Sequence, residues 1–462
     1  MIDRLASGNE RLDRILDGGL PGNAIHLIAG PPGSGKTILA EQYAFANATV
    51  ERPAVYFSTV SEPLDKLVRF GQTLEFFDVL AIGQRVFYED LGDDLEKGGL
   101  RRTLERIRTV LRERCPGILI IDSFKALTAY ADSHRDFRSF LYQLAADTGA
   151  VTGSSFWLGE YDLDTITGEP EFAIADSILG LGSQRAGERS SRVLEVLKLR
   201  GSGYLSGQHA YRISARGLSV FPRLADTIDT SSYELGAGRL STGIDALDEM
   251  LTDGYWPGSS TLCAGPSGIG KTLLGLHFVV AGAAAGERGI VASLQENPTQ
   301  LTRVAAAFGW TLDESVTMMY RSPVDLYVDE WIYELLGMID RLGVKRVLID
   351  SLTDLLFASR EEIRFREYMY SLTQRCSRLG VSLFMTSELR DLFAVNRLSE
   401  YGVSHLSDNV LVLQYLRDGA TIRRAITPLK TRASRNDPRM REFTIGAGGI
   451  TLADSTKGRS AH

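Results

Sequence analysis

The chain of 462 residues repeats itself once, and this internal duplication limits what it can fold into more than any other feature. Residues 4–8 (RLASG) recur as residues 239–243 (RLSTG), and a glycine-rich segment at 30–37 recurs 235 positions later at 265–272. The tripeptide Ile-Asp-Ser also occurs once in each copy, in the same order. A repeat of this length with ordered landmarks indicates a duplicated domain and not a short solenoid unit.

The two copies are joined by a segment without the pattern of a helix or a strand. Residues 222–236 (PRLADTIDTSSYELG) are mostly polar, lack apolar periodicity and end in glycine. We therefore expect a first domain over residues 1–224, a linker over 225–236 and a second domain over 237–452. A short polar tail is expected over residues 453–462.

Within each copy, short apolar runs alternate with longer stretches whose apolar residues recur at helical spacing. In the first copy such a stretch at 101–114 precedes the apolar run 118–121, and in the second copy residues 331–342 precede the run 346–349. This alternation is typical of a sheet of mostly parallel strands covered by helices. We therefore predict an α/β fold with two tandem domains, each a mostly parallel twisted sheet covered by helices.

Both glycine-rich segments fit the pattern G-x-x-x-x-G-K-[ST], and each stands between an apolar strand and a predicted helix. Glycines let successive backbone N–H groups turn inward around phosphate oxygens, and the helix N-terminus adds its positive end. The lysine reaches the β- and γ-phosphates, and the hydroxyl binds Mg²⁺. Two matches at equivalent repeat positions predict two P-loop sites for ATP. The predicted phosphate-binding residues are Gly30, Pro31, Gly33, Ser34, Gly35, Lys36 and Thr37 in the first copy and Gly265, Pro266, Ser267, Gly268, Ile269, Gly270, Lys271 and Thr272 in the second.

Asp122 and Asp350 each end an apolar strand and are followed by serine. An aspartate at this place reaches Mg²⁺ or its bound water in P-loop enzymes. An Asp-Ser pair is also a good helix cap, and for each residue taken alone this alternative stays open. Together with the loop hydroxyls, the predicted Mg²⁺ residues are Thr37, Asp122, Thr272 and Asp350.

Hydrolysis also needs a group that aligns the attacking water. Glu62 and Glu296 each follow the strand that comes after a phosphate loop and its helix, which makes them the candidate bases. Each also precedes a proline at the start of the next predicted helix, so a capping role is the alternative.

Two pairs of cations, at 198–200 (Lys-Leu-Arg) and 430–432 (Lys-Thr-Arg), are expected to share one face of a strand because side chains alternate. Such a pair could stabilise transition-state charge on the phosphate of a neighbouring subunit. The alternative is a solvated edge strand protected by charge. The trans-acting candidates are Lys198, Arg200, Lys430 and Arg432.

Composition argues against several classes of partner. The formal net charge is −7, so no overall basic field indicates nucleic acid. The first residues carry scattered charges without a secretory apolar core, and no uncharged apolar run is long enough to span a bilayer. We therefore expect a cytoplasmic protein without a membrane partner. The net charge argues against nucleic acid as a partner but leaves local basic patches open. Cys115, Cys263 and Cys376 lack metal-ligand spacing and are expected to be reduced, buried thiols.

Taken together, these residues resemble the KaiC family, the double-domain branch of the RecA-like ATPases. The similarity covers nearly the whole chain and rests on R-L-x-x-G-x-x-x-L-D before each phosphate loop, on the Ile-Asp-Ser strands and on EVLKLRGSGYLSG (195–207). Residues 411–445 are similar to the family's second-domain ending over most of their length. The resemblance implies two RecA-like P-loop domains, a hexamer of two stacked rings, ATP at the subunit interfaces, and the four cations supplied in trans.

The chain departs from the family pattern at three places. Where the family has adjacent glutamates after the strand, the first position holds Ser61 in one copy and Gln295 in the other. Serine cannot act as a carboxylate base, and glutamine orients water without accepting a proton, so we expect slow hydrolysis or use of the second glutamate. At the family's adjacent Ser-Thr phosphorylation pair the chain has Ser404 and His405, which leaves one acceptor hydroxyl. The chain also ends soon after Leu452, so we expect a clock-independent relative.

Three functional hypotheses follow. The first is a slow hexameric ATPase whose nucleotide state sets its shape for a regulatory protein partner, with serine autokinase activity as a variant. The second is a DNA-acting RecA-type recombinase or helicase relative, which the arginine-rich stretches 185–192 and 432–441 would serve, although arginines in a solvated loop or an interface are the commoner explanation. The third is a nucleotide-gated scaffold that binds ATP without turnover, which the residues at the two base positions favour.

Overall fold

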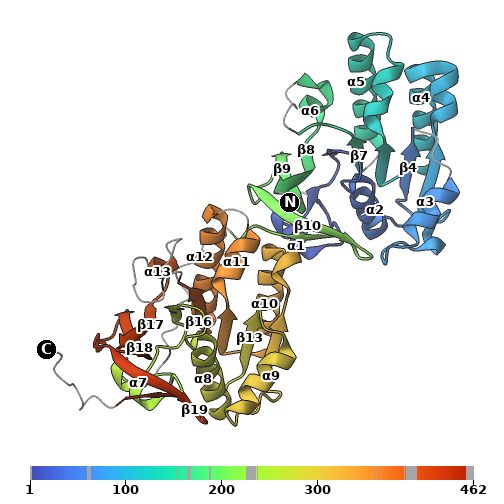
Figure 1. The fold of residues 1–462 in the computed structure, drawn as a ribbon. Coiled ribbons are helices and arrows are strands. Elements are labelled where there is room, and N and C mark those ends of the chain that lie inside the picture. The colour runs from blue at the N-terminus through green and yellow to red at the C-terminus, as the bar shows by residue number, and fades with distance from the viewer. Residues whose placement is uncertain are drawn as a thin grey trace. The chain divides into compact units, whose positions relative to one another are not determined.

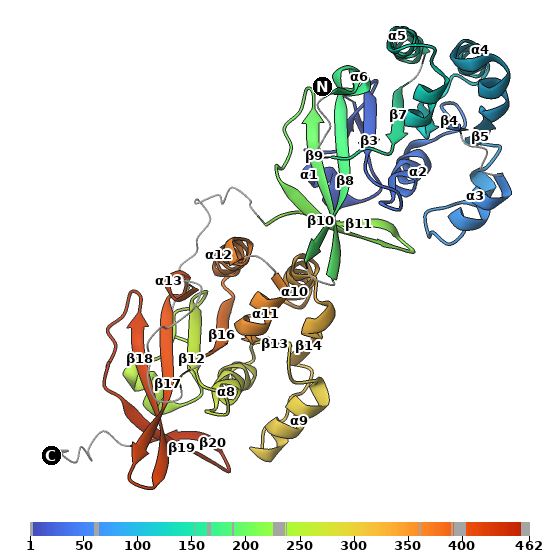
Figure 2. The same ribbon diagram turned by 45° about the horizontal axis from the view of Figure 1, so that its top comes forward.

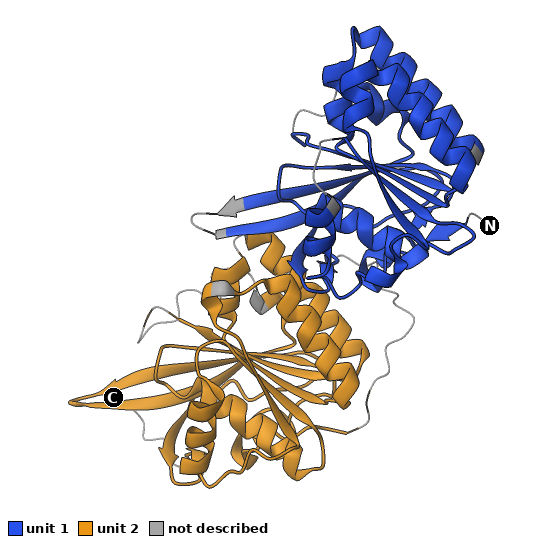
Figure 3. Cartoon of the chain, turned by 90° about the vertical axis from the view of Figure 1, so that its right-hand side faces the viewer, with its two compact units in different colours: residues 1–223 blue, residues 224–462 orange. Residues whose placement is uncertain are grey.

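The structure is a computed structural model that describes residues 3–59, 64–151, 153–163, 168–186, 189–224, 236, 238–359, 362–389, 391 and 403–453. It divides into two compact units, residues 1–223 and residues 224–462 (Figure 3). Most of the expected linker and nearly all of the expected tail lie outside the described residues. Among the described helices, none is long and apolar enough to cross a membrane.

The first unit is built on a nine-stranded sheet with the strand order β11-β10-β9-β8-β3-β7-β6-β4-β5. Its six strands from β3 to β8 are parallel, and β9 to β11 extend the sheet as antiparallel strands (Figure 2). A separate two-stranded ribbon pairs β1 (Arg4–Leu5) with β2 (Leu20–Pro21). The strands of the large sheet are β3 (Ile25–Ala29), β4 (Ala54–Ser58), β5 (Val86–Asp90), β6 (Ile118–Asp122), β7 (Ser154–Gly159), β8 (Ser177–Ala186), β9 (Arg189–Leu199), β10 (Gln208–Ser214) and β11 (Gly217–Phe221).

Helices cover both faces of this sheet because successive residues of each strand point to opposite sides. Ile28 and Tyr56 face α2, whereas the preceding residues Leu27 and Val55 face α4 and α5 (Figure 1). The sheet is therefore the middle layer between two apolar cores. The helices are α1 (Glu10–Ile15), α2 (Lys36–Asn47), α3 (Leu64–Gly71), α4 (Gly92–Arg114), α5 (His134–Val151) and α6 (Pro170–Ile174), with 3₁₀ turns η1 (Val79–Ala81) and η2 (Phe124–Tyr130).

The second unit repeats this architecture with the strand order β14-β13-β15-β16-β12-β17-β18-β19-β20. The strands from β12 to β17 are parallel, and β18 to β20 continue the sheet in antiparallel fashion. In Figure 2, β12, β17 and β18 lie side by side as β3, β8 and β9 do in the first unit. The strands are β12 (Ser260–Gly265), β13 (Gly289–Ser293), β14 (Val316–Tyr320), β15 (Arg346–Asp350), β16 (Ser382–Glu388), β17 (Asn409–Asp418), β18 (Thr421–Thr431), β19 (Arg441–Gly446) and β20 (Gly449–Leu452).

Its helices also form two layers, with α8 on one face of the sheet and α10, α11 and α12 on the other (Figure 1). The prediction of two tandem α/β domains with mostly parallel sheets is thus confirmed. The helices are α7 (Asp245–Met250), α8 (Lys271–Ala284), α9 (Pro298–Ala307), α10 (Val328–Leu342), α11 (Leu352–Ser359), α12 (Glu362–Arg378) and α13 (Val403–Leu406), with the 3₁₀ turn η5 (Pro323–Asp325).

Two local expectations were wrong. Cys263 and Cys376 are buried, but Cys115 is exposed because it is the C-cap of α4, where the backbone leaves the helix in a left-handed conformation. Arg200 and Arg432 do not share a strand with their partner lysines, because β9 and β18 each end one residue earlier. After Arg200 the chain turns at Gly201, whose φ of +74° ends the extended conformation.

Candidate nucleotide-binding sites

The first phosphate loop joins the carboxyl end of β3 to the amino end of α2. Gly33 and Gly35 have φ values of +73° and +92°, in the left-handed region that favours glycine. A Cβ at Gly30 would lie 2.1 Å from the carbonyl oxygen of Leu181 in β8. Glycine is therefore required for this loop to turn from strand into helix, and the turn delivers the chain to a helix N-terminus, where anions bind.

The second phosphate loop joins β12 to α8 with the same backbone conformation. Gly268 and Gly270 have φ values of +74° and +116°, and a Cβ at Gly265 would lie 2.9 Å from the carbonyl oxygen of Leu413. Ile269, predicted among the phosphate-binding residues, buries its side chain completely in the core beside α8, so only its backbone faces the site. The two loops are thus equivalent in the places that a phosphate cradle requires.

In each loop, a tyrosine hydroxyl from the antiparallel part of the sheet or its neighbouring strand donates a hydrogen bond to the backbone carbonyl of the loop serine. Ser34 O accepts a hydrogen bond of 2.6 Å from the Tyr211 hydroxyl, and Ser267 O accepts one of 3.5 Å from Tyr415. The Ser34 Oγ atom is buried and has no hydrogen-bond partner among the described residues. The loop thus keeps one buried polar atom that a phosphate oxygen could satisfy.

The two loop lysines fold back over their loops. Lys36 Nζ donates to the carbonyl oxygens of Gly30 and Pro31, at 3.0 Å each, and Lys271 Nζ donates to Pro266 O at 2.9 Å. Burial lowers the pKa of both ammonium groups. Among the described residues, neither ammonium has an anionic partner in contact, and phosphate oxygens would supply one.

Each loop threonine meets the aspartate that was predicted to share Mg²⁺ with it. Thr37 Oγ1 donates to Asp122 Oδ2 at 2.7 Å, and Thr272 Oγ1 donates to Asp350 Oδ2 at 2.7 Å. The contact forms because β6 and β15 end at the same sheet edge as the strands that lead into the loops. Hydroxyl and carboxylate oxygens suit Mg²⁺, which usually takes one or two protein ligands and completes its shell with water and phosphates. The residues present therefore fit this ion.

Sequence reasoning missed a further donor to each of these aspartates. Tyr56, from β4, donates its hydroxyl to Asp122 Oδ2 at 2.6 Å, and Thr386, from β16, donates to Asp350 Oδ1. Both donors stand in apolar strand sequences, where a tyrosine or a threonine gives no local sign of such a role. Their part in the site depends on strand order, which no short motif encodes.

Glu296 lies between β13 and α9, and its Oε2 atom is buried without a hydrogen-bond partner among the described residues. Burial raises the pKa of this carboxyl, and the nearby Asp350 raises it further. The alternative role of helix cap is taken by Asn297, which forms a capping box with Gln300 at the start of α9. Gln295 turns away to donate to Asp354 at 2.9 Å. Glu296 therefore remains available for chemistry.

The corresponding candidates of the first unit, Glu62 and Ser61, lie outside the described residues, and so does the side chain of Ser404. His405 belongs to α13, and its carbonyl oxygen accepts a hydrogen bond of 3.0 Å from Arg432.

The four predicted trans-acting cations lie far along the sheet from the phosphate loop of their own unit. Lys198 pairs in register with Ile178 near the amino end of β8, and Ile178 pairs with Leu27, the middle residue of β3, whereas the loop follows the carboxyl end of β3. Lys198 Nζ donates to Phe172 O at 3.1 Å. Arg200 forms an ion pair of 3.3 Å with Asp176.

The second unit repeats this arrangement. Lys430 Nζ donates to Ser407 O at 2.6 Å, and Arg432 lies 3.6 Å from Asp408. The structure thus brings none of the four cations to the phosphate loop of its own unit.

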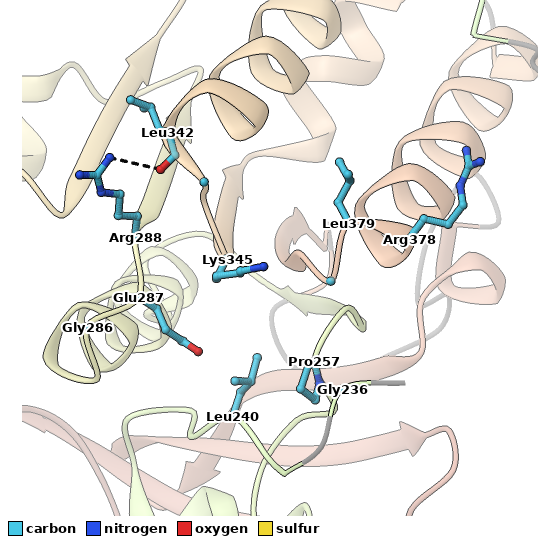
Figure 4. Close-up of a pocket in the computed structure, with 12 residues that line it drawn as sticks. Gly236, Leu240, Pro257, Gly286, Glu287, Arg288, Leu342, Lys345, Arg378 and Leu379 are labelled. Carbon is cyan, nitrogen blue, oxygen red and sulfur yellow. Dashed lines mark hydrogen bonds between the residues drawn. The ribbon is translucent and has the colours of Figure 1, made fainter. Parts of the chain in front are cut away.

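A cavity of about 740 Å³ lies at the amino ends of the strands in the second unit. Figure 4 shows Lys345 and Glu287 directed toward it, while Arg288 donates to Leu342 O at 3.2 Å. This cavity is at the sheet edge opposite the phosphate loop. In the first unit, a cavity of about 660 Å³ adjoins the loop residues Pro31 and Pro32.

The fold and the paired sites define a class: a tandem P-loop protein with two RecA-like α/β domains. A model of the family described as "ATPase: KaiC" matches residues 5–225 and 240–457, so the chain belongs to the KaiC ATPase family. It is therefore a KaiC-like ATP-binding protein.

Curated relatives extend this assignment over nearly the full length of the chain. The circadian clock oscillator protein KaiC of Picosynechococcus sp. (strain ATCC 27264 / PCC 7002 / PR-6) is 28% identical over 473 residues, which cover 98% of this chain and 90% of the relative. The circadian clock oscillator protein KaiC 1 of Synechocystis sp. is 27% identical, and the circadian clock oscillator protein KaiC of Synechococcus elongatus is 28% identical, with the same coverage of both chains.

Proposed function

We propose that this protein is a slow ATPase that binds Mg²⁺-ATP at both phosphate loops and works as a hexameric, nucleotide-dependent regulatory ring for a protein partner. One contact supports this above all others: the hydrogen bond of 2.7 Å between loop threonine and strand-end aspartate, made by Thr37 with Asp122 and by Thr272 with Asp350. Both units keep this polar contact although the residues around it have diverged.

The chain's own groups have distinct roles in this proposal. The loop glycines hold the backbone against the phosphates, and Lys36 and Lys271 exchange their loop carbonyls for phosphate oxygens. Each threonine and aspartate pair holds Mg²⁺, which neutralises charge on the β- and γ-phosphates when it is bound.

Glu296 is the proposed base of the second site, and Glu62 is its counterpart in the first. The raised pKa of Glu296 suits a group that must accept a proton from water near neutral pH. With Ser61 and Gln295 at the preceding positions, each site has one carboxylate in this segment, and slow turnover is expected.

Assembly into a ring is proposed because the cations Lys198, Arg200, Lys430 and Arg432 stand at the sheet edge remote from their own loops. In a ring they would act on the nucleotide of a neighbouring subunit, where they stabilise charge that develops in the transition state. Phosphate contacts that cross a subunit boundary would also make the shape of the ring depend on the nucleotide state.

Phosphate release by the full-length protein tests the ATPase, alongside Glu62→Gln, Glu296→Gln and the double variant, with assembly followed by light scattering. Lys36→Ala with Lys271→Ala is the matched control that removes phosphate binding. Turnover lost in the glutamine variants while rings persist supports the proposal. An inactive parent that still assembles with ATP would refute hydrolysis and leave the binding function.

A nucleotide-gated scaffold without turnover is the second candidate. It is favoured by Gln295, whose amide is engaged with Asp354 and does not supply a base. Serine autokinase activity is proposed only at Ser404, and labelling with γ-³²P-ATP that persists in Ser404→Ala would refute it.

A further inference from the structure

The carboxylates of Asp122 and Asp350 have the same sequence context but different hydrogen-bond surroundings. Both hydroxyl donors to Asp122, from Thr37 at 2.7 Å and Tyr56 at 2.6 Å, reach the same oxygen, Oδ2. At Asp350 the two donors are divided, because Thr272 reaches Oδ2 and Thr386 reaches Oδ1. The first site thus concentrates its two donors on one oxygen of its Mg²⁺ aspartate.

Tyr56 is itself held by a buried polar column in the core between the sheet and α2. The ring of Tyr88, from the edge strand β5, packs against that of Tyr56 with 5.2 Å between the centroids. The Tyr88 hydroxyl donates to Glu41 Oε1 of α2 at 3.0 Å. Glu41 is 4% exposed and Tyr56 is 3% exposed, so both polar groups are enclosed by the core. A buried carboxylate is costly unless it has such a donor, which suggests that the column has a purpose beyond packing.

The second unit has no counterpart of this column among its described residues, as strand register shows. Tyr56 lies opposite Ile120 two residues before the end of β4, and Val291 lies opposite Leu348 at the same place in β13. Met318 of β14 pairs with Val291 as Tyr88 of β5 pairs with Tyr56. Glu41 follows the loop lysine by five residues, and Leu276 occupies that position in α8. Each polar member of the column is therefore replaced by an apolar residue.

We propose that Tyr56 is a positioning residue for the first site: it holds the Asp122 carboxylate in the conformation that meets Thr37, and Tyr88 with Glu41 holds Tyr56. The two sites of the chain then differ in their Mg²⁺ requirement through residues outside the phosphate loops. This inference rests on the proposed role of the first loop as a Mg²⁺-ATP site. Hydrogen bonds to a metal-binding carboxylate change metal affinity by about 10- to 100-fold when they are removed.

The test measures Mg²⁺ dependence of nucleotide binding in the full-length protein, with the second site silenced by Lys271→Ala. The probe is the fluorescent nucleotide mant-ATP, titrated at increasing MgCl₂. Tyr56→Phe keeps the ring and removes only the hydroxyl, and we expect it to raise the Mg²⁺ concentration for half-saturation about tenfold. Tyr88→Phe should shift it in the same direction by a smaller factor. Binding of mant-ATP without Mg²⁺ should stay as in the parent, because the loop is untouched.

Tyr43→Phe is the matched control. Tyr43 is fully buried in the same core on α2, and its hydroxyl has no hydrogen bond to Asp122 or Glu41 in the described structure. If the Mg²⁺ requirement shifts equally in Tyr43→Phe and Tyr56→Phe, the shift comes from a general loosening of the core and not from the Tyr56 hydrogen bond. This result would overturn the proposal. So would an unchanged requirement in a Tyr56→Phe protein with the parent's circular dichroism and melting temperature. A Lys271→Ala parent that binds no mant-ATP at any Mg²⁺ concentration would instead refute the proposed first site, and the inference with it.

Discussion

The buried carboxyl of Glu41 should make the stability of the first unit depend on pH, and Glu41→Gln should remove that dependence. Burial raises the pKa of Glu41 to about 7 from an ordinary value of 4.5. The folded unit therefore keeps a proton between pH 4.5 and 7 that the unfolded chain has released. Stability from this group is fully present below pH 4.5 and is lost as pH rises toward 7.

The loss of stability equals the difference between the folded and unfolded pKa values of Glu41, multiplied by about 1.4 kcal/mol for each pH unit. It amounts to about 3 kcal/mol. Glutamine has the same shape and still accepts the hydrogen bond from Tyr88, but it does not titrate. We therefore expect the difference in unfolding free energy, Glu41→Gln minus parent, to increase by about 3 kcal/mol from pH 4.5 to pH 8. Titrating groups distant from Glu41 are common to both proteins and cancel in the difference.

Hydrogen exchange of amides in β6 and β7, measured by mass spectrometry across a urea series, reports opening of the first unit separately from the second. Glu113→Gln provides a control, because this glutamate is exposed at the end of α4. Unfolding free energies of the parent and of Glu41→Gln that run parallel from pH 4.5 to 8, within about 1 kcal/mol, would contradict this prediction. They would show that the carboxyl ionises without a burial penalty.

Three further predictions concern both units. Arg346→Leu should destabilise the second unit by about 3–5 kcal/mol in urea unfolding, because the 3% exposed Arg346 side chain bonds Glu287 at 2.6 Å and two backbone carbonyls. Burial lowers the pKa of His277 to about 4. The second unit should therefore lose about 3 kcal/mol of stability as the pH falls from 6.5 to 4. His277→Gln should still accept the hydrogen bond from Ile450 N and should remove this pH dependence. Thr37→Val should weaken Mg²⁺-dependent mant-ATP binding at the first site at least tenfold while Mg²⁺-independent binding persists.

Each of these has an outcome that contradicts it. A loss of unfolding free energy below about 1 kcal/mol in Arg346→Leu would show that Glu287 and the two backbone carbonyls find other partners. If His277→Gln still loses stability below pH 6.5, the titrating group is a residue other than His277. If Thr37→Val has the same Mg²⁺ requirement as the parent, the Thr37 hydroxyl does not belong to the metal site.

The paired sites were predictable in part because their motifs are local. In the phosphate loops, glycines, lysine and threonine act through contiguous backbone, so eight residues specify the turn into the helix. The aspartates could be named because parallel strands end at a common edge, which places Asp122 near Thr37 whenever the alternation of strand and helix is correct. The capping alternative for Glu296 needed the structure, which assigns the cap to Asn297.

Other features depend on how distant segments meet, and no local pattern contains them. Tyr56 and Thr386 reach the aspartates from different neighbouring strands, so the strand order of the sheet decides which residue becomes a donor. The exposure of Cys115 follows from the end point of α4, which apolar periodicity places only to within a few residues.

A duplicated α/β chain with two phosphate loops could be predicted from the sequence alone, because duplication, periodicity and the loop motif all lie along contiguous residues. The tertiary structure was needed to show that the aspartates of the two sites have different hydrogen-bond surroundings. The column of Glu41, Tyr88 and Tyr56 exists because α2 packs on the sheet where β4 lies between β5 and β6. Its polar groups meet across 47 positions of the chain between Glu41 and Tyr88, and across 66 positions between Tyr56 and Asp122. Contacts at such separations are set by sheet register and helix packing, which depend on the whole domain.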